Sequence, residues 1–336
     1  MDMKTEYLGL ELDHPVVVSA CQPLSRDLEK LKQMEEDGAA AVVLHSLFEE
    51  QIVNESTALD HYLSYKEESF AEALTFFPEM SEYNLLPRQY LELIEEAKEE
   101  LDIPLVGSLN GVSTGGWLEY AEKIESAGVD ALELNIFYMP LETEMSGREL
   151  EEKYVAIVEE VNDRISIPLT VKIGPYFSSI PKMAEELVAA GAEGLTLFNR
   201  FYQPDFDIEN LEVVSDLQLS RSYDMRLPLR WTALMHGKIE TDFAITGGVH
   251  NHEDVIKAMM AGGKVTMLAS ELLENGSSRM KEITANMKQW LVKNNYDSVN
   301  QMQGSMSQQA LDSTAAIERA NYTRAIHSWS REPGGY

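Results

Sequence analysis

Short apolar runs alternate with longer amphipathic segments along most of the chain. Each run is bounded by glycine or proline, which is typical of a buried strand in a parallel sheet. Two phrases introduce the runs: a glycine followed at once by apolar residues, as in G-A-A-A-V-V-L, and the phrase I-P-L, as in I-P-L-T-V-K. Strands are therefore predicted at residues 16–20, 38–44, 103–108, 128–134, 167–172, 191–197, 242–246 and 262–268.

Amphipathic helices are predicted between most of these strands. They cover residues 25–37, 87–101, 115–127, 147–164, 180–190 and 253–261. Eight strand–helix units favour an α/β fold of the (β/α)8 TIM-barrel type. The doubly wound sheet competes with this fold, but it should carry an early glycine-rich dinucleotide turn. No G-x-G-x-x-G occurs in the chain.

Other segments extend the predicted barrel. Residues 7–15 alternate about a glycine and predict an N-terminal hairpin. Long loops follow strand 2, at 46–86, and strand 6, at 199–226, on the side where barrel active sites form. The barrel is predicted to occupy residues 1–275. Residues 276–336 are predicted to form a C-terminal helical extension of the same domain, with helices at 278–293 and 315–326.

The charge and the cysteine content limit the binding partners and the cell compartment that we expect. The formal net charge is −30 over 336 residues, so contacts with nucleic-acid backbones or anionic membrane surfaces are disfavoured. No apolar run approaches the length of a membrane span. A single cysteine, Cys21, permits no internal disulfide and leads us to expect a cytoplasmic protein.

Small, hydroxyl and amide side chains end the predicted strands, together with one lysine. Taken alone, Lys172 is compatible equally with a ligand contact and with a side chain that extends to solvent. A whole ring of polar strand ends favours the ligand contact, because these ends meet at one face of a barrel. The ring consists of Ala20, Cys21, His45, Ser46, Ser108, Asn110, Asn135, Lys172, Asn199, Thr246, Gly247, Gly248, Ala269 and Ser270.

The turns after strands 7 and 8 have the character of a phosphate site. Glycines 247 and 248 allow close approach to backbone N–H groups, and Ser270 can cap a helix or donate to a phosphate. Arg226 and Arg230 are either further anion ligands or surface ion-pair partners. A ligand that reaches from this turn to Lys172 must be long and flat, which suits flavin mononucleotide (FMN).

Several motifs together resemble the class 1 dihydroorotate dehydrogenases, and most of all the branch of dihydroorotate dehydrogenase-like proteins. They are Y-L-G-L-E-L-D-H-P-V-V-V-S-A near the N-terminus, E-L-N at 133–135, V-K-I-G-P-Y-F at 171–177 and I-T-G-G-V at 245–249. The resemblance covers about residues 7–273. It implies oxidation of dihydroorotate, or of a related dihydropyrimidine, by hydride transfer to flavin N5, and a role in pyrimidine biosynthesis.

The resemblance also assigns residues. It implies Lys172 at the flavin edge, Asn135 and Asn199 beside flavin and substrate, and a phosphate at the two glycine and serine turns. The remaining expected cofactor contacts are Ala20, Cys21, Ser46, Ser108, Thr246, Gly247, Gly248, Ala269 and Ser270. A homodimer is expected. The chain has no cysteine cluster for an iron–sulfur centre, so electrons are expected to leave through a soluble acceptor or a partner protein.

Three departures from the family pattern concern the chemistry. The family's strand-4 motif N-L-S-C-P-N reads N-I-F-Y-M-P here, so the position of the base falls on Tyr138, either a weak proton carrier or a wall residue. His45 replaces an expected lysine, as a partial substitute or as a buried strand-end histidine. The family's asparagine-bearing loop has no clear match within 46–86.

Two rival functions remain open from the sequence. Lys172 could form a Schiff base in an aldolase that grips a phosphorylated substrate. Alternatively, the chain could bind flavin without dihydroorotate dehydrogenase activity, because the family's cysteine or serine base is missing.

Overall fold

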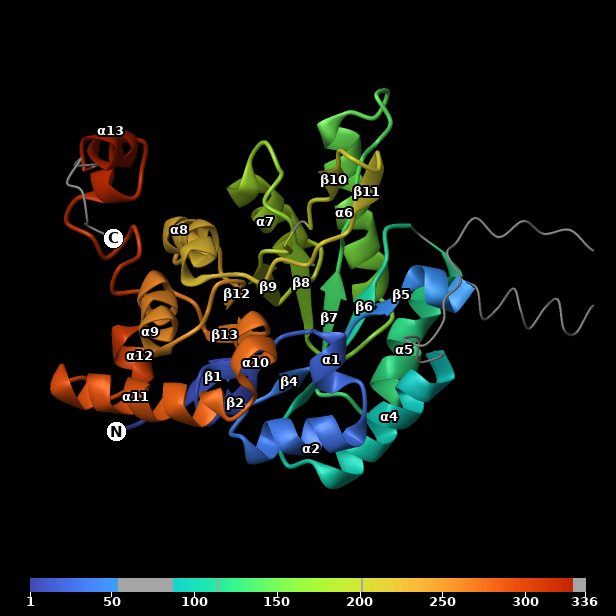
Figure 1. Ribbon diagram of the computed structural model, residues 1–336, viewed down its shortest axis with the longest axis horizontal. Helices are drawn as coiled ribbons and strands as arrows, with labels where there is room; N and C mark the ends of the chain where they lie inside the picture. The colour runs from blue at the N-terminus through green and yellow to red at the C-terminus, as the bar shows by residue number, and fades with distance from the viewer. Residues whose placement is uncertain (54–86, 114, 201, 329–336) are drawn as a thin grey trace, which may run out of the picture.

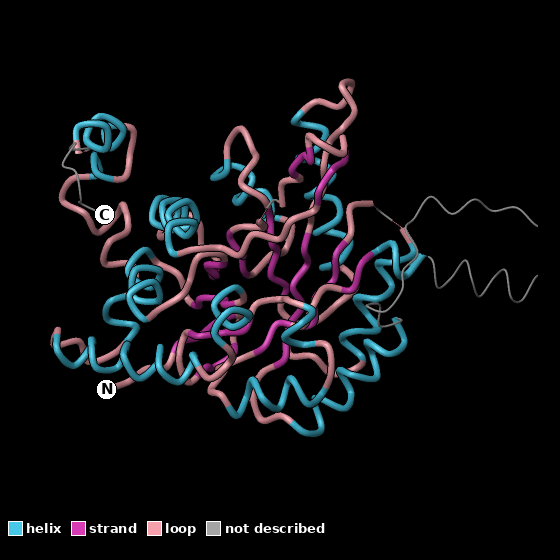
Figure 2. The backbone as a smooth tube through the Cα atoms, in the orientation of Figure 1, coloured by secondary structure: helices cyan, strands magenta, loops and turns pink. Residues whose placement is uncertain are grey.

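A barrel of eight parallel strands forms the centre of the molecule in the computed structural model, which describes residues 1–53, 87–113, 115–200 and 202–328 (Figures 1 and 2). The strand order is β4-β3-β13-β12-β9-β8-β7-β6, and a β4–β6 pairing closes the ring. The predicted (β/α)8 barrel is therefore confirmed. Its strands are β3 (Val16–Val18), β4 (Val42–Val43), β6 (Leu105–Asn110), β7 (Ala131–Asn135), β8 (Leu169–Ile173), β9 (Gly194–Leu197), β12 (Asp242–Thr246) and β13 (Val265–Leu268).

Helices cover the outside of the barrel and follow the strands in turn (Figure 1). Their apolar faces are buried against the strands, as the periodicity predicts. Ser146 begins α6 with a capping box, because its hydroxyl accepts from Glu149 N and its own N–H donates to the Glu149 carboxylate. The helices are α2 (Leu28–Glu36), α4 (Pro87–Glu100), α5 (Glu119–Ser126), α6 (Gly147–Asn162), α7 (Ile180–Ala189), α8 (Arg226–Met235), α9 (His252–Ala261), α10 (Ser270–Asn275) and α11 (Arg279–Lys293).

The first predicted helix is divided in the structure. A short helix, α1 (Gln22–Ser25), precedes α2, so the prediction of one helix over 25–37 is wrong at its start. Asp27 separates the two, because its carboxylate accepts from Lys30 N and caps α2. Ser25 is fully buried in α1 and is free to make contacts elsewhere.

The N-terminal hairpin closes the base of the barrel. It consists of β1 (Thr5–Tyr7) and β2 (Leu10–Leu12), joined through Leu8 and Gly9, both with positive φ. Leu8 is almost fully buried, and its N–H donates to the Asp242 carboxylate at 2.8 Å. The predicted hairpin is confirmed, although it begins at Thr5.

The long connections and the C-terminal segment carry further elements. Of the first predicted long loop, residues 54–86 lie outside the described residues, and β5 (Leu47–Phe48) adds to β6. The loop after strand 6 holds the hairpin of β10 (Asp205–Asp207) and β11 (Glu212–Val214), followed by η2 (Ser222–Met225). The predicted helix at 315–326 is instead η3 (Thr314–Ala316) and α13 (Ala320–His327), which stands apart from the barrel in Figure 1.

Helix α11 packs against α9 and α10, and α12 (Val299–Met302) follows it near the N-terminus. The division of the chain at residue 275 stays a prediction. Within the described ranges, no helix is both long enough and apolar enough to cross a bilayer.

Candidate active site

A cavity of about 410 Å³ opens at the carboxyl ends of the barrel strands. Its size falls within the range of ligand-binding cavities. The strand ends that the sequence singles out converge there, although they are scattered over most of the chain. The predicted residues that line it are Ala20, Cys21, His45, Ser46, Asn135, Lys172, Asn199, Thr246, Gly247, Gly248, Ala269 and Ser270.

Lys172 is buried and paired with a carboxylate. Its Nζ lies 3.6 Å from Oε1 of Glu133, which is fully buried on the neighbouring strand β7. The other oxygen, Oε2, accepts from the Thr196 hydroxyl at 3.3 Å, whereas Oε1 has no hydrogen bond within the described structure. The signal for this partner was the glutamate in the otherwise apolar strand A-L-E-L-N, and sequence reasoning missed its role.

Hydroxyl groups continue this contact down the interior of the barrel. Thr196 Oγ1 lies 3.3 Å from Thr170 Oγ1, which accepts from the Tyr7 hydroxyl at 3.0 Å. Burial raises the pKa of Tyr7, so its hydroxyl stays protonated and acts as a donor. A polar chain thus links the hairpin at the base of the barrel to the lysine at its mouth.

Two asparagines and two serines form a second row, beside the lysine. Asn199 Nδ2 donates to Asn135 Oδ1 at 2.7 Å and lies 3.3 Å from the Lys172 carbonyl oxygen. Asn135 Nδ2 in turn lies 3.4 Å from Ser46 Oγ, and Ser46 Oγ lies 2.8 Å from Ser108 Oγ. Ser108 is fully buried and does not line the cavity, so it can support Ser46 but cannot touch a ligand there.

The charge of the cavity differs from that of the whole protein. Its described lining contains the cations Lys172 and Arg200 and no aspartate or glutamate. The chain as a whole carries a formal charge of −30. Lys172 is paired with the buried Glu133, but no carboxylate lines the described part of the cavity itself, and this suits an anionic ligand.

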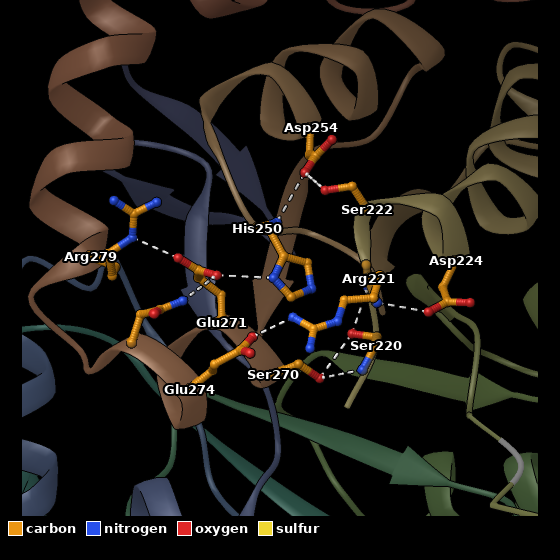
Figure 3. Close-up of polar contacts among 12 residues, drawn as sticks. Ser220, Arg221, Ser222, Asp224, His250, Asp254, Ser270, Glu271, Glu274 and Arg279 are labelled. Carbon is orange, nitrogen blue, oxygen red and sulfur yellow. Dashed lines mark hydrogen bonds and ion pairs between the residues drawn. The ribbon is translucent and has the colours of Figure 1, made fainter. Parts of the chain in front are cut away.

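The turns after β12 and β13 meet at a serine that the sequence did not identify. Ser220 accepts at its hydroxyl from Gly248 N at 3.1 Å, and Figure 3 shows it beside Ser270. Both its N–H, at 3.0 Å, and its hydroxyl, at 2.8 Å, donate to Ser270 Oγ. Ser270 therefore keeps its own hydrogen for another acceptor. Gly247, with φ of +81°, has open space where a Cβ would stand, so Gly247 and Ser270 can face a phosphate.

Ion pairs hold these turns from behind (Figure 3). Arg221 pairs with Glu274 at 2.6 Å, and Glu271 accepts from Arg279 at 2.6 Å and contacts His250 Nδ1 at 3.0 Å. The carboxylates of Glu271 and Glu274 are thus each paired with an arginine. Through the pair of Arg221 and Glu274, the loop before α8 is fixed to α10.

Tyr138 lies outside the main cavity. Among the described residues, it lines two neighbouring cavities of about 250 and 270 Å³, and its N–H lies 3.3 Å from the Tyr154 hydroxyl. Arg226 and Arg230 line a separate cleft beside α8 and are not among the described residues that line the main cavity.

His45 is anchored at the end of the second barrel strand. Its backbone N–H donates to Ser25 Oγ at 2.8 Å, and its Nδ1 lies 3.1 Å from the Ser25 carbonyl oxygen. Tyr90 packs edge-on against the ring at 5.2 Å. Burial lowers the pKa of His45 and raises the pKa of the neighbouring Cys21 thiol.

The pKa shifts of three histidines predict acid sensitivity. Burial lowers the pKa of His14, His45 and His236 below the ordinary 6.5. As the pH falls toward 6.5 and below it, these histidines bind protons in the unfolded chain more readily than in the folded protein. The free energy of unfolding should therefore fall as the pH drops from 7 to 5.5. Each histidine can contribute at most about 1.4 kcal/mol per pH unit. Urea unfolding at both pH values measures the loss, and an unchanged difference in the double variant His14→Gln/His45→Gln would contradict this origin.

Comparison with known proteins identifies one family. The family profile described as dihydroorotate dehydrogenase matches residues 84–291. A dihydroorotate dehydrogenase B (NAD(+)) catalytic subunit from Thermoplasma volcanium is 25% identical over 311 residues, 90% of this chain and 98% of its own. Proteins of the same name from Methanocaldococcus jannaschii and Pyrococcus furiosus are also similar. The first is 25% identical over 84% of this chain and 90% of its own, and the second is 23% identical over 90% and 98%.

Proposed function

The chain belongs to the dihydroorotate dehydrogenase family, and we propose that it is an FMN-dependent oxidoreductase that oxidises dihydroorotate, or a related dihydropyrimidine, at a C–C bond. The observation that carries this proposal is the described lining of the mouth cavity, which contains Lys172 and Arg200 and no carboxylate, in a chain of net charge −30. An anionic cofactor and an anionic substrate would both be favoured there.

The residues present fit FMN. Gly247 and Ser270 are suited to its phosphate, since one offers close backbone approach and the other a free hydroxyl hydrogen. Lys172 would hold the ring edge on which negative charge develops, and Glu133 would fix the lysine from below. Bound FMN would supply the hydride acceptor, at N5.

The amide row suits a planar substrate with amide groups. Asn135 and Asn199 each line the cavity and can turn donor and acceptor atoms toward it. All three relatives named above carry NAD(+) in their names. For this chain we propose a soluble electron acceptor or a partner protein.

We also propose that the protein is a homodimer. Light scattering of the purified protein would give a mass of twice 37.8 kDa for the dimer.

The test begins with the visible absorption spectrum. We expect a yellow protein, or an apoprotein that turns yellow on addition of FMN. Addition of dihydroorotate without oxygen should then bleach the flavin absorption, and L-lactate, an anion without the amide groups, is the matched control. A set of dihydropyrimidines separates the leading substrate from its relatives.

Other outcomes assign the rival functions. A colourless protein whose Lys172 is trapped by borohydride with a carbonyl substrate would overturn the proposal in favour of an aldolase. A yellow protein that no dihydropyrimidine bleaches would instead be a flavin-binding protein without this activity.

A further inference from the structure

The cavity contains few groups that can accept a proton at neutral pH. Lys172 and Arg200 are donors with no free lone pair in their charged forms. Burial raises the pKa of the Cys21 thiol, and partial burial raises that of the Tyr202 phenol, so both hold their protons. His45 is the remaining titratable group of the described lining, and burial keeps it neutral.

Ser25 fixes the tautomer of His45. A carbonyl oxygen only accepts, so the 3.1 Å contact between Nδ1 and the Ser25 carbonyl favours the tautomer with the ring hydrogen on Nδ1. The Ser25 hydroxyl oxygen also lies 3.3 Å from Nδ1. Its own hydrogen goes to the Cys21 carbonyl and it accepts from His45 N, so it can accept from Nδ1 as well, in agreement with this tautomer. Nε2 therefore carries the lone pair.

The same contacts orient the ring. With Nδ1 turned toward Ser25 in α1 and Tyr90 packed edge-on from α4, the edge with Nε2 remains for the cavity that His45 lines. Within the described part of the chain, no hydrogen bond engages Nε2. Among the described residues, Cys21, Lys172, Arg200 and Tyr202 share the cavity lining with His45, and Tyr90 contacts its ring. The charge of Lys172 is offset by Glu133.

We propose that His45 is the catalytic base of this site, accepting at Nε2 the proton that the substrate releases. The inference rests on the proposed function. Oxidation of a CH–CH bond to C=C removes a proton from one carbon and a hydride from the next. The proton would pass to Nε2 and give an imidazolium, while the electron pair of the first C–H bond forms the new π bond. Bound FMN would supply the acceptor for the hydride. The imidazolium then returns its proton to solvent.

The tautomer can be tested without turnover. In protein labelled with ¹⁵N-histidine, long-range ¹H–¹⁵N spectra at pH 7.5 should show His45 with the hydrogen on Nδ1. His14 is the matched control, because its Nδ1 accepts from Val16 N at 3.3 Å and its hydrogen must lie on Nε2. His45→Gln and His14→Gln assign the two signals. A hydrogen on Nε2 of His45 would overturn the proposal.

The kinetic test follows flavin bleaching by a substrate as a function of pH. The wild-type rate should fall as the pH drops through the lowered pKa of His45, because the protonated ring cannot accept. His45→Gln should slow bleaching by about 10²–10⁴-fold and abolish this acid limb. His14→Gln should keep both rate and limb. If His45→Gln keeps the limb, or Tyr138→Phe removes it, His45 is not the base.

The outcomes separate this inference from the proposed function. If no substrate bleaches the wild-type flavin, the proposed function fails, whatever tautomer His45 adopts. If bleaching occurs in the wild type and in His45→Gln at the same rate, the function stands and the assignment of the base fails. Unchanged FMN affinity and thermal unfolding of His45→Gln would show that the variant is folded.

Discussion

Replacing Lys172 by methionine is expected to lower the free energy of unfolding of the apoprotein by about 3–5 kcal/mol. The substitution keeps most of the side-chain volume but removes the cation that lies 3.6 Å from the fully buried Glu133 carboxylate. An isolated carboxylate in the barrel interior has no water to solvate it. Urea unfolding at pH 7 measures the effect.

Two further variants locate the cause. Lys172→Met/Glu133→Gln removes both charges and should recover most of the lost stability. Lys182→Met removes a lysine whose partner Glu185 is exposed, and it should cost less than about 1 kcal/mol. Equal instability of Lys172→Met and the double variant would contradict the account, because the carboxylate would then not be responsible.

A second large contrast is expected between adjacent glycines. Both Gly247 and Gly248 have positive φ, which costs an alanine about 1–2 kcal/mol. A Cβ on Gly247 would meet no atom within 4 Å, whereas one on Gly248 would stand 2.5 Å from Met225 N and 2.7 Å from the Arg221 carbonyl oxygen. Gly248→Ala must therefore displace backbone and should destabilise the fold more than Gly247→Ala.

The main effect expected of Gly247→Ala is on FMN affinity and not on stability. Gly247→Ala adds a methyl group on the proposed phosphate path, so we expect a folded protein whose Kd for FMN rises at least about tenfold, or ~1.4 kcal/mol. Fluorescence quenching of FMN on binding gives the Kd, and thermal unfolding gives the stability. Native-like FMN affinity in Gly247→Ala would remove this glycine from the proposed phosphate site.

The barrel could be predicted because its local signals repeat. Each helix-ending glycine followed by an apolar run marked a strand entry, and in Gly38, Gly128 and Gly191 the structure has the positive φ that such an ending requires. The ring of strand ends followed from topology alone, since parallel strands bring their carboxyl ends to one face. The start of α2 could not be placed in this way, because Ser25 and Asp27 are both good caps and only burial separates them.

The partners within the site were harder to predict. Glu133 belongs to the E-L-N motif, and the neighbouring sequence contains no signal that its side chain turns inward to Lys172. Ser220 sits in a long loop, and only tertiary structure brings it to Gly248 and Ser270. Tyr138 was selected by its motif position, yet its neighbours in space are Tyr154 and Lys153.

The hairpin at the base of the barrel has a consequence for folding. Thr5 donates to the Lys264 carbonyl oxygen and Leu8 to Asp242, contacts that span 259 and 234 residues. The hairpin thus finds these partners only after the last barrel strands, β12 and β13, have been made. Such long-range closure slows folding and keeps the hairpin's apolar residues exposed in the nascent chain. Completion of the barrel, and of the polar chain that ends at Lys172, therefore has to wait for the synthesis of β12 and β13.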